Sequence, residues 1–107
     1  MTKELFTENI QWQNDTFKQA TALSKLAHLK EELQELHNDV ENNSPDKRLE
    51  FADCFILLFG AAASCDMSYD DIQDAIKEKM VINYQRKWGK PNEEGYVKHE
   101  GDTFFKG

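Results

Sequence analysis

The chain has 107 residues, of which 39% are hydrophobic and 11% aromatic, and its formal net charge is -7. That length allows one domain with one modest core, and the composition excludes an intrinsically disordered chain. The excess of acids argues against a sequence-reading DNA-binding protein, which usually carries a basic face.

Neither a membrane span nor a signal peptide is expected. The longest apolar run, Cys54–Ala63, falls well short of the roughly 20 apolar residues that a span requires. The N-terminus lacks the basic and then apolar layout of a signal peptide. We therefore expect a cytoplasmic protein with neither membrane nor nucleic acid among its partners.

The abundance of Glu, Lys, Leu, Ala and Gln favours helices over strands. Partly periodic apolar residues predict a first helix over Glu4–Ala20. A second helix is clearer, because its apolar seam has alternating spacings of three and four residues. The seam consists of Leu26, Leu29, Leu33, Leu36 and Val40.

The segment Asn42–Asp46 is expected to end the second helix and begin the third. Ser44 suits the N-cap and Pro45 the first helical position, so the third helix is predicted over Pro45–Cys65. Its middle is apolar on nearly every side, interrupted only by Asp53 and one glycine. Such a helix is buried on all sides, and a chain this short has little material to wrap it. We therefore predict an oligomer that assembles through this helix, with Asp53 as a buried acid.

A fourth helix should begin at Ser68, the predicted N-cap. Asp71, three residues on, lies in a capping-box position, and the helix is expected to end near Trp88. From Pro91 onward the chain is rich in glycine and aromatic residues, which is typical of an irregular tail with room for a short hairpin.

These elements predict an all-α fold: a four-helix antiparallel bundle-type subunit that assembles through its helices and carries an irregular C-terminal tail. One domain would span residues 1–107, with a helical core over about 4–88 and the tail over 89–107. Cys54 and Cys65 lie in one predicted helix, where about 1.5 Å of rise per residue separates them by roughly 16 Å. That is too far for a disulfide, so we expect two buried thiols.

Two pairs of acidic residues are the best indication of a functional site in the sequence. Glu32 and Glu35 lie on the second predicted helix, three residues apart and therefore on one face. Glu50 and Asp53 have the same spacing on the third. The two helices should form an antiparallel hairpin, in which about 1.5 Å of rise per residue brings the two pairs level. The four carboxylates should therefore converge.

Four converging carboxylates repel one another unless a cation lies between them. An all-oxygen ligand set without cysteine favours Mg²⁺, with Mn²⁺ as a substitute. The missing Glu-x-x-His motif argues against a ferritin-like di-iron site. The alternative is a solvated helix face, which is the commoner role of acids such as Glu31, Glu32 and Glu35.

With these acids the chain resembles the MazG-like nucleoside triphosphate pyrophosphohydrolases of the all-α NTP pyrophosphatase superfamily. The likeness rests on Glu31-Glu32-x-x-Glu35 followed by Glu50-x-x-Asp53 on the next helix. It continues over nearly the whole chain, through Trp12, Phe17, His28, Lys79–Gly89 and Gly95–His99.

The resemblance implies hydrolysis of a nucleoside or deoxynucleoside triphosphate to the monophosphate and pyrophosphate, with Mg²⁺. By position, it makes metal ligands of Glu32, Glu35, Glu50 and Asp53. It gives Glu31 the catalytic role of holding or deprotonating the attacking water. It also implies a homodimer or homotetramer.

Basic residues of the fourth predicted helix are candidates for substrate binding. The resemblance places Lys79 and Asn83, one turn apart, against the triphosphate. Arg86 and Lys87 are further candidates to neutralise the leaving pyrophosphate. A solvated basic helix end is the alternative, because cations there stabilise the helix dipole.

Two aromatic side chains are candidates for contact with the nucleoside. Trp12 could stack on the nucleobase and His28 could touch the nucleotide, with packing roles as the alternative for both. Two other functions stay open. One is a non-catalytic nucleotide-binding or adaptor helical oligomer, against which the four intact acids argue. The other is a related phosphohydrolase of a non-nucleotide pyrophosphate, whose metal site would look the same.

Overall fold

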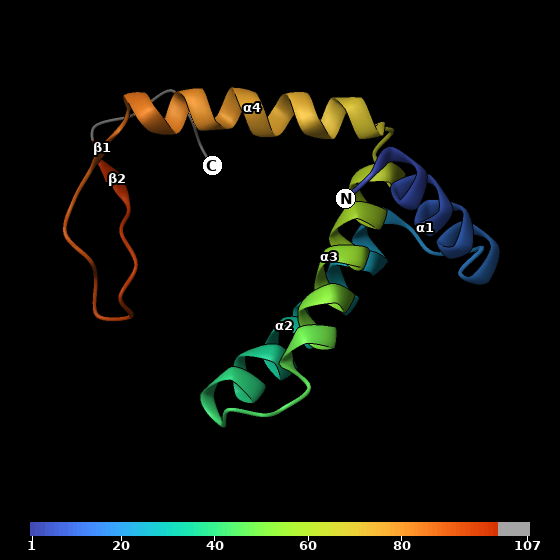
Figure 1. The fold of residues 1–107 in the computed structure, drawn as a ribbon, viewed down its shortest axis with the longest axis horizontal. Coiled ribbons are helices and arrows are strands. Elements are labelled where there is room, and N and C mark those ends of the chain that lie inside the picture. The colour runs from blue at the N-terminus through green and yellow to red at the C-terminus, as the bar shows by residue number, and fades with distance from the viewer. Residues whose placement is uncertain (101–107) are drawn as a thin grey trace. The chain divides into compact units, whose positions relative to one another are not determined.

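The computed structural model describes residues 1–100 and is predominantly helical (Figure 1), which confirms the all-α class. Its elements are α1 (Lys3–Thr16), α2 (Ala22–Glu41), α3 (Lys47–Ser64), α4 (Tyr69–Gln85), β1 (Lys87–Trp88) and β2 (His99–Glu100). The chain divides into two compact units, Met1–Ile72 and the part from Gln73 onward, and each is described by itself.

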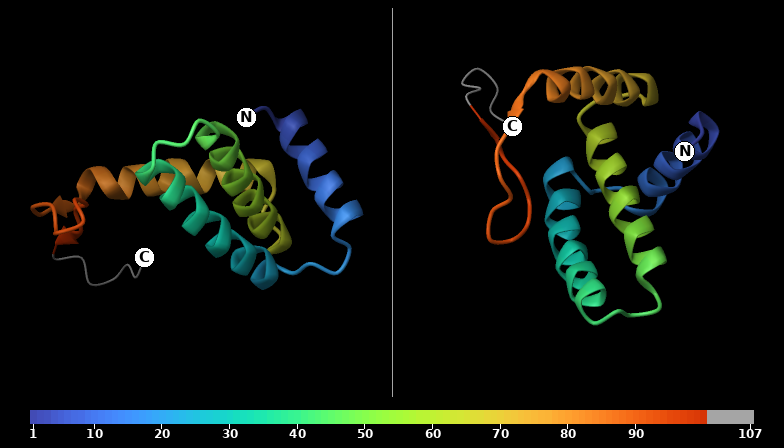
Figure 2. Two further views of the ribbon diagram at one scale, coloured as in Figure 1. Left: turned by 90° about the horizontal axis from the view of Figure 1, so that it is seen from below. Right: turned by 60° about the vertical axis from the view of Figure 1, so that its left-hand side comes forward.

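The first unit is built on a hairpin of α2 and α3, which lie side by side (Figure 2). Its core consists of Leu29, Leu36, Cys54 and Leu57. Near the start of α2, the Lys25 Nζ donates to the hydroxyl of Ser64, at the end of α3, over 3.0 Å. The start of one helix therefore meets the end of the other, which confirms the predicted antiparallel hairpin.

The apolar seam of α2 is only half buried. Leu29 and Leu36, seven residues apart, are buried against α3, whereas Leu26 and Leu33 are 38% and 47% exposed. Thr21 and Ser24 form a capping box that fixes the start of the helix. Because α3 covers only one narrow face of α2, alternate members of the seam stay open to solvent within the unit.

Helix α1 is shorter than predicted. It ends at Thr16, where the Phe17 N–H donates to the Gln13 carbonyl, and not at Ala20. Its buried residues are Phe6 and Gln13. The Phe6 ring packs edge-on against Phe59 of α3, with centroids 5.9 Å apart. This contact selects the face that α1 turns towards α3.

The predicted start of α3 is wrong by two residues. The N-cap is Asp46, and Ser44 donates its N–H to the Asp39 carbonyl, closing the end of α2 instead of opening α3. Both cysteines are free, but only Cys54 is buried. Cys65 is exposed because it caps the end of the helix, so the prediction of two buried thiols is half wrong.

Within residues 1–100 no single helix is both long and apolar enough to cross a membrane. Only α3 and α4 taken together as a bent pair meet the criterion, by length and composition alone. Core helices of soluble proteins pass the same test.

The predicted capping box of α4 is confirmed, since Ser68 and Asp71 exchange side chain-to-backbone bonds of 2.9 and 3.1 Å. The helix ends at Gln85, three residues before the predicted end. Two short strands follow as an antiparallel pair in which Trp88 lies opposite His99. The Trp88 indole donates to the Asn83 carbonyl over 3.0 Å, which turns the chain out of the helix. The short hairpin is thus present, and part of the tail, 101–107, lies outside the described residues.

Leu29→Ala should destabilise the protein by about 2–5 kcal/mol, because it leaves a cavity between α2 and α3. Leu23→Ala is the matched control on the same helix, since Leu23 is 79% exposed and Leu29 only 8%. The control should change the free energy of unfolding by no more than about 0.5 kcal/mol. Urea denaturation measures both. Equal losses would contradict the described core.

Candidate active site

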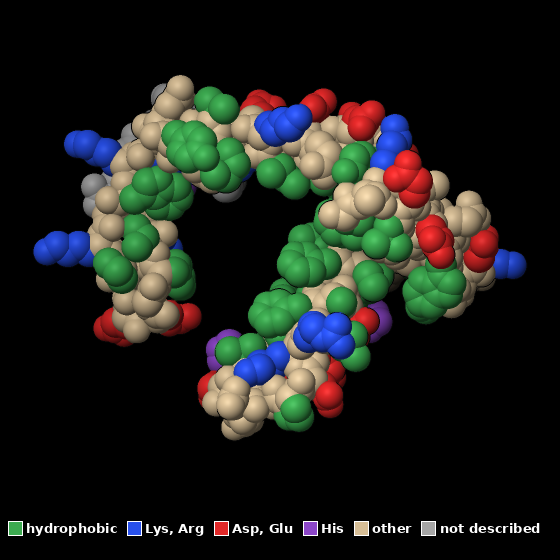
Figure 3. Space-filling model, viewed as in Figure 1, with side chains coloured by type: hydrophobic (Ala, Val, Ile, Leu, Met, Phe, Trp, Pro, Cys, Tyr) green, Lys and Arg blue, Asp and Glu red, His purple; other side chains and the backbone are tan. Residues whose placement is uncertain are grey.

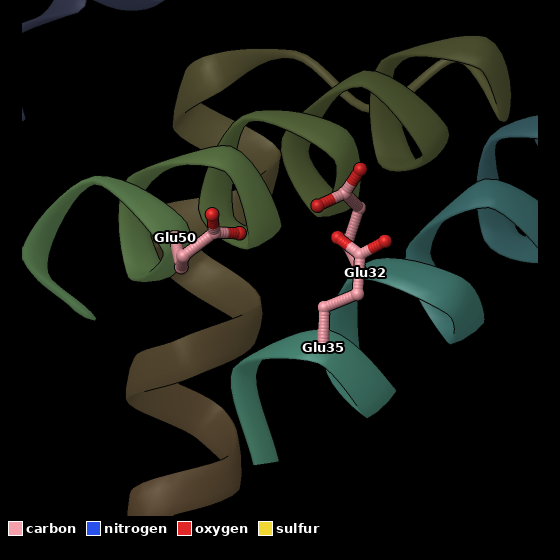
Figure 4. Close-up of side chains that lie close together, drawn as sticks. All are labelled: Glu32, Glu35 and Glu50. Carbon is pink, nitrogen blue, oxygen red and sulfur yellow. The ribbon is translucent and has the colours of Figure 1, made fainter. Parts of the chain in front are cut away.

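Three of the predicted ligands meet at the hairpin of α2 and α3. Glu32 and Glu35 project from α2 towards Glu50 on α3 (Figure 4). One carboxylate oxygen from each of the three lies within 4.8 Å of the others. We call this group the carboxylate trio. The antiparallel register of the helices creates it, as the spacing arithmetic predicts.

Two members of the trio, Glu35 and Glu50, have pKa values raised above the ordinary value of a glutamate. The negative charge of Glu32 raises the pKa of Glu35, with smaller contributions from burial and from a hydrogen bond to Glu32. Burial raises the pKa of Glu50 first, followed by the charges of Asp39 and Glu32. A positive charge at the trio would reverse both effects.

Asp53 lies beside the trio rather than inside it. It is exposed in the single chain, because α1 and α2 cover α3 incompletely. The predicted burial of Asp53 refers to the oligomer and stays a prediction. The charge of Asp53 contributes to the raised pKa values of Glu50 and of the Cys54 thiol, although burial is the larger cause in both.

A pocket of about 220 Å³ opens next to these acids. Its walls consist of Trp12, Gln13, Phe17, His28, Glu32, Asp53, Ile56 and Leu57. The Trp12 ring meets Phe17 edge-on with centroids 5.5 Å apart, and the His28 Nε2 lies 3.2 Å from the Glu32 Oε1. The pocket therefore joins an aromatic wall from the α1 end to two carboxylates.

Of the remaining predicted site residues, one belongs to α2 and the others to the second unit. Glu31 is exposed on α2, and its charge contributes to the raised pKa of Glu35 one turn later. In the second unit, Lys79 and Asn83 lie on α4, one turn apart. Arg86 and Lys87 were predicted on that helix, but Arg86 follows its end and Lys87 is in β1.

Two residues near the acids were missed from the sequence. Asp39 follows Glu35 by one turn of α2, and its charge raises the pKa of Glu50 more than that of Glu32 does. The helical spacing could have found it. Gln13 forms part of the pocket wall and is only 1% exposed. No sequence signal distinguishes it from an exposed glutamine.

The donor set fits a divalent cation. Three carboxylate oxygens at mutual separations of up to 4.8 Å supply hard oxygen ligands on one side of a possible ion. The charge of Glu32 raises the pKa of Glu35 and burial raises that of Glu50, and a cation between the carboxylates would favour the ionised form of both. Glu35 is also exposed, which leaves access for water or a phosphate to complete the coordination.

The fold and the carboxylate site define an all-α pyrophosphohydrolase. A sequence profile described as dATP/dGTP pyrophosphohydrolase matches residues 5–102. The chain therefore belongs to the dATP/dGTP pyrophosphohydrolase family, and it is an enzyme of the nucleotide diphosphatase type. A search of curated protein sequences finds no significant match.

The structure is similar to that of the cyanophage S-2L MazG-like pyrophosphohydrolase, bound to dGDP and three catalytic Mn²⁺ ions per active site. The TM-score is 0.79 and the sequence identity 27%, over 96% of this chain and 97% of the other. The predicted resemblance to MazG-like enzymes is thereby confirmed. The relative's metals and nucleotide are properties of that protein.

Glu50→Gln should stabilise the ion-free protein at neutral pH. A carboxyl whose pKa is raised above its ordinary value of 4.5 destabilises the fold when ionised, and this cost disappears as the pH falls towards 4.5. Melting temperatures in EDTA should therefore be higher for Glu50→Gln at pH 7.5 and converge with wild type at pH 4.5. Excess Mn²⁺ should reverse the order at pH 7.5.

Glu41→Gln is the control for this comparison. Glu41 lies on α2 and pairs with His37 at 3.5 Å on an exposed surface, where such a pair contributes little. Its removal should change neither the EDTA melting temperature nor the response to Mn²⁺. Equal behaviour of the two variants would show that Glu50 is not electrostatically coupled to Glu32 and Glu35.

Proposed function

We propose that the protein hydrolyses purine deoxynucleoside triphosphates to the monophosphate and pyrophosphate, with Mg²⁺ or Mn²⁺. The observation that carries the proposal is the carboxylate trio beside an aromatic pocket. The family's description names dATP and dGTP, and the cyanophage relative binds dGDP with Mn²⁺, both of which support the choice of substrate and metal.

In this proposal Glu32, Glu35 and Glu50 hold divalent ions, and Asp53 completes the ligand set from beside them. When bound, the ions neutralise phosphate charge, the largest electrostatic demand of phosphoryl-type transfer. Glu31 orients the attacking water or accepts its proton. The exposure of Glu31 supports that role, because a water molecule can reach its carboxylate.

Cationic and amide side chains of the second unit would bind the phosphates. Lys79 and Asn83, on one face of α4, are proposed for the triphosphate. Arg86 and Lys87 are proposed for the leaving pyrophosphate, from the segment that joins α4 to β1.

The 220 Å³ pocket is proposed for the nucleoside. Sites for complete drug-sized ligands measure about 300–1,000 Å³, so a smaller pocket suits part of a nucleotide. Trp12 supplies an aromatic ring on which a base can stack. His28 contacts Glu32 at 3.2 Å and lies at the junction between the pocket and the proposed ions.

With Mg²⁺ or Mn²⁺ present, purified protein should release pyrophosphate from dATP or dGTP. Glu50→Gln and Asp53→Asn should each lower the turnover by at least about 100-fold, because each removes a proposed ligand of the ions that would stabilise the reacting phosphates. Pyrophosphate release across a panel of NTPs and dNTPs measures the effect, with Glu41→Gln as the control.

The panel also separates the alternatives. No turnover of any nucleotide with either metal would contradict the proposed substrates, and turnover of a non-nucleotide pyrophosphate alone would indicate a different phosphohydrolase. Full activity of Glu50→Gln or Asp53→Asn would contradict the site assignment. The absence of nucleic acid and membrane partners and the cytoplasmic localisation stay predictions.

We further propose a homodimer or homotetramer that assembles through α3. Hydrophobic side chains gather along this helix (Figure 3), and Phe51, Phe55 and Leu58 are 45%, 56% and 50% exposed. Their spacing of four and three residues forms one stripe. An apolar groove of about 650 Å³ adjoins it, with Leu5 and Trp12 of α1 among its walls. Contiguous exposed apolar surface of this kind is typical of subunit interfaces.

Phe55→Ser combined with Leu58→Ser should dissociate the oligomer, because the double variant removes the apolar stripe that would be buried. Light scattering should show the monomer mass of 12.5 kDa for the variant and a multiple of it for wild type. Leu23→Ser, at a position 79% exposed on α2, is the control and should keep the wild-type mass. A monomeric wild type would contradict the proposed assembly.

A further inference from the structure

Three helices of the first unit meet at a buried polar junction around Gly60 of α3. From α1, the Gln13 Nε2 donates to the Ile56 carbonyl over 2.9 Å. From α2, the Lys25 Nζ lies 3.4 Å from the Gly60 carbonyl and donates to the Ser64 hydroxyl. Gln13 and Lys25 are 1% and 6% exposed. The junction thus ties both neighbouring helices to the Ile56–Ser64 stretch of α3.

Gly60 leaves the space that the Gln13 carboxamide occupies. A Cβ at this position would collide with the carboxamide of Gln13, whose Oε1, Cδ and Nε2 all lie within contact distance of it. The Oε1 is buried and accepts no hydrogen bond in the described structure. The Gln13 side chain is therefore wedged between α1 and α3, with its orientation fixed through Nε2 by Ile56 and by the Asn9 Oδ1 at 3.0 Å.

The stability of the fold does not by itself explain why position 13 carries an amide side chain. A buried carbonyl oxygen without a partner costs free energy, whereas an apolar side chain of similar shape would fill the space without that cost. The amide adds a directional bond: Nε2 donates to the Ile56 carbonyl of α3, which fixes how α1 is rotated and placed along α3, while its bond to Asn9 within α1 orients the side chain. An apolar contact would allow α1 to slide or turn.

The junction lies next to the proposed nucleoside pocket. Gln13 is itself part of the pocket wall, and its chain neighbour Trp12 supplies the aromatic side. Its acceptor, Ile56, lies one turn after Asp53 and also lines the pocket. The position of the aromatic wall relative to Asp53 thus depends on the bond between Gln13 and Ile56.

We propose that Gln13 is a positioning residue for nucleoside binding, which acts by holding Trp12 against the pocket beside Asp53. This inference rests on the proposed function, since it assigns the pocket to the nucleoside. Gln13 itself has no room to touch a ligand through its buried Oε1, and its effect passes through the placement of α1.

Gln13→Met tests the inference, because it keeps the side-chain length and removes the hydrogen bond. The KM for dGTP should rise about 10-fold with kcat changed less than twofold, and the affinity for dGDP in the presence of Mn²⁺ should fall by a similar factor. Binding of Mn²⁺ alone should not change, because the trio lies on α2 and α3. The melting temperature should stay the same or rise.

Fluorescence gives a readout that a purely structural role would not move. In a Trp88→Phe background, Trp12 is the single tryptophan. Its emission should be quenched by dGDP in the protein with Gln13, and quenched much less after Gln13→Met. Asn9→Ala, which removes one acceptor and leaves the bond to Ile56, should shift KM and quenching in the same direction by a smaller factor.

A second variant, Gly60→Ala, disturbs the contact between Gln13 and Gly60 from the α3 side. Its Cβ should expel the Gln13 carboxamide and raise the KM for dGTP as Gln13→Met does. Once Gln13 has been shortened to Ala, adding Gly60→Ala should bring no further rise, because the colliding atoms are gone. If Gly60→Ala raised the KM further in the Gln13→Ala background, the proposed contact between Gln13 and Gly60 would be contradicted.

The inference is overturned if Gln13→Met leaves KM, dGDP affinity and Trp12 quenching at wild-type values, or if the variant weakens Mn²⁺ and dGDP binding equally. The failure of the proposed function looks different, since wild type itself would release no pyrophosphate. In that case the dGDP and fluorescence titrations still decide whether Gln13 positions the pocket. Should Gln13→Met fail to fold, Asn9→Ala carries the same comparison.

Discussion

The two antiparallel helices α2 and α3 hold three carboxylates in register although the carboxylates repel one another. The buried contacts of α2 and α3 place Glu32 and Glu35 opposite Glu50, although each raises the cost of ionising another. A fold that served stability alone would separate these charges. The apolar hairpin supplies the free energy that holds them together, and a divalent cation converts their repulsion into binding.

The other features of the first unit are a pocket wall formed by α1 and an exposed apolar stripe on α3. Helix α1 adds an aromatic wall to the acidic pocket, and a wedge of Gln13 against Gly60 sets its position. The uncovered stripe of α3 leaves apolar surface that the proposed second subunit would cover. The acidic composition that argues against DNA binding is therefore compatible with a nucleotide ligand, because several of the acids would face cations rather than phosphates.

Local periodicity made the acids predictable, since residues three apart share a helical face and rise per residue fixes their level. Contacts between elements were harder to foresee. Phe6 is buried through its ring contact with Phe59 of α3, and the Trp88 indole bonds the Asn83 carbonyl where α4 ends. The burial of Gln13 depends on a glycine far along the sequence, a pairing that no local pattern reveals.

The most direct test of the account is a crystal structure with Mn²⁺ and a non-hydrolysable dGTP analogue, with anomalous scattering recorded at the manganese edge. The account predicts manganese peaks in coordination contact with Glu32, Glu35 and Glu50, and the base of the analogue against Trp12. Manganese peaks away from these carboxylates, with the trio facing solvent in the complex, would contradict it.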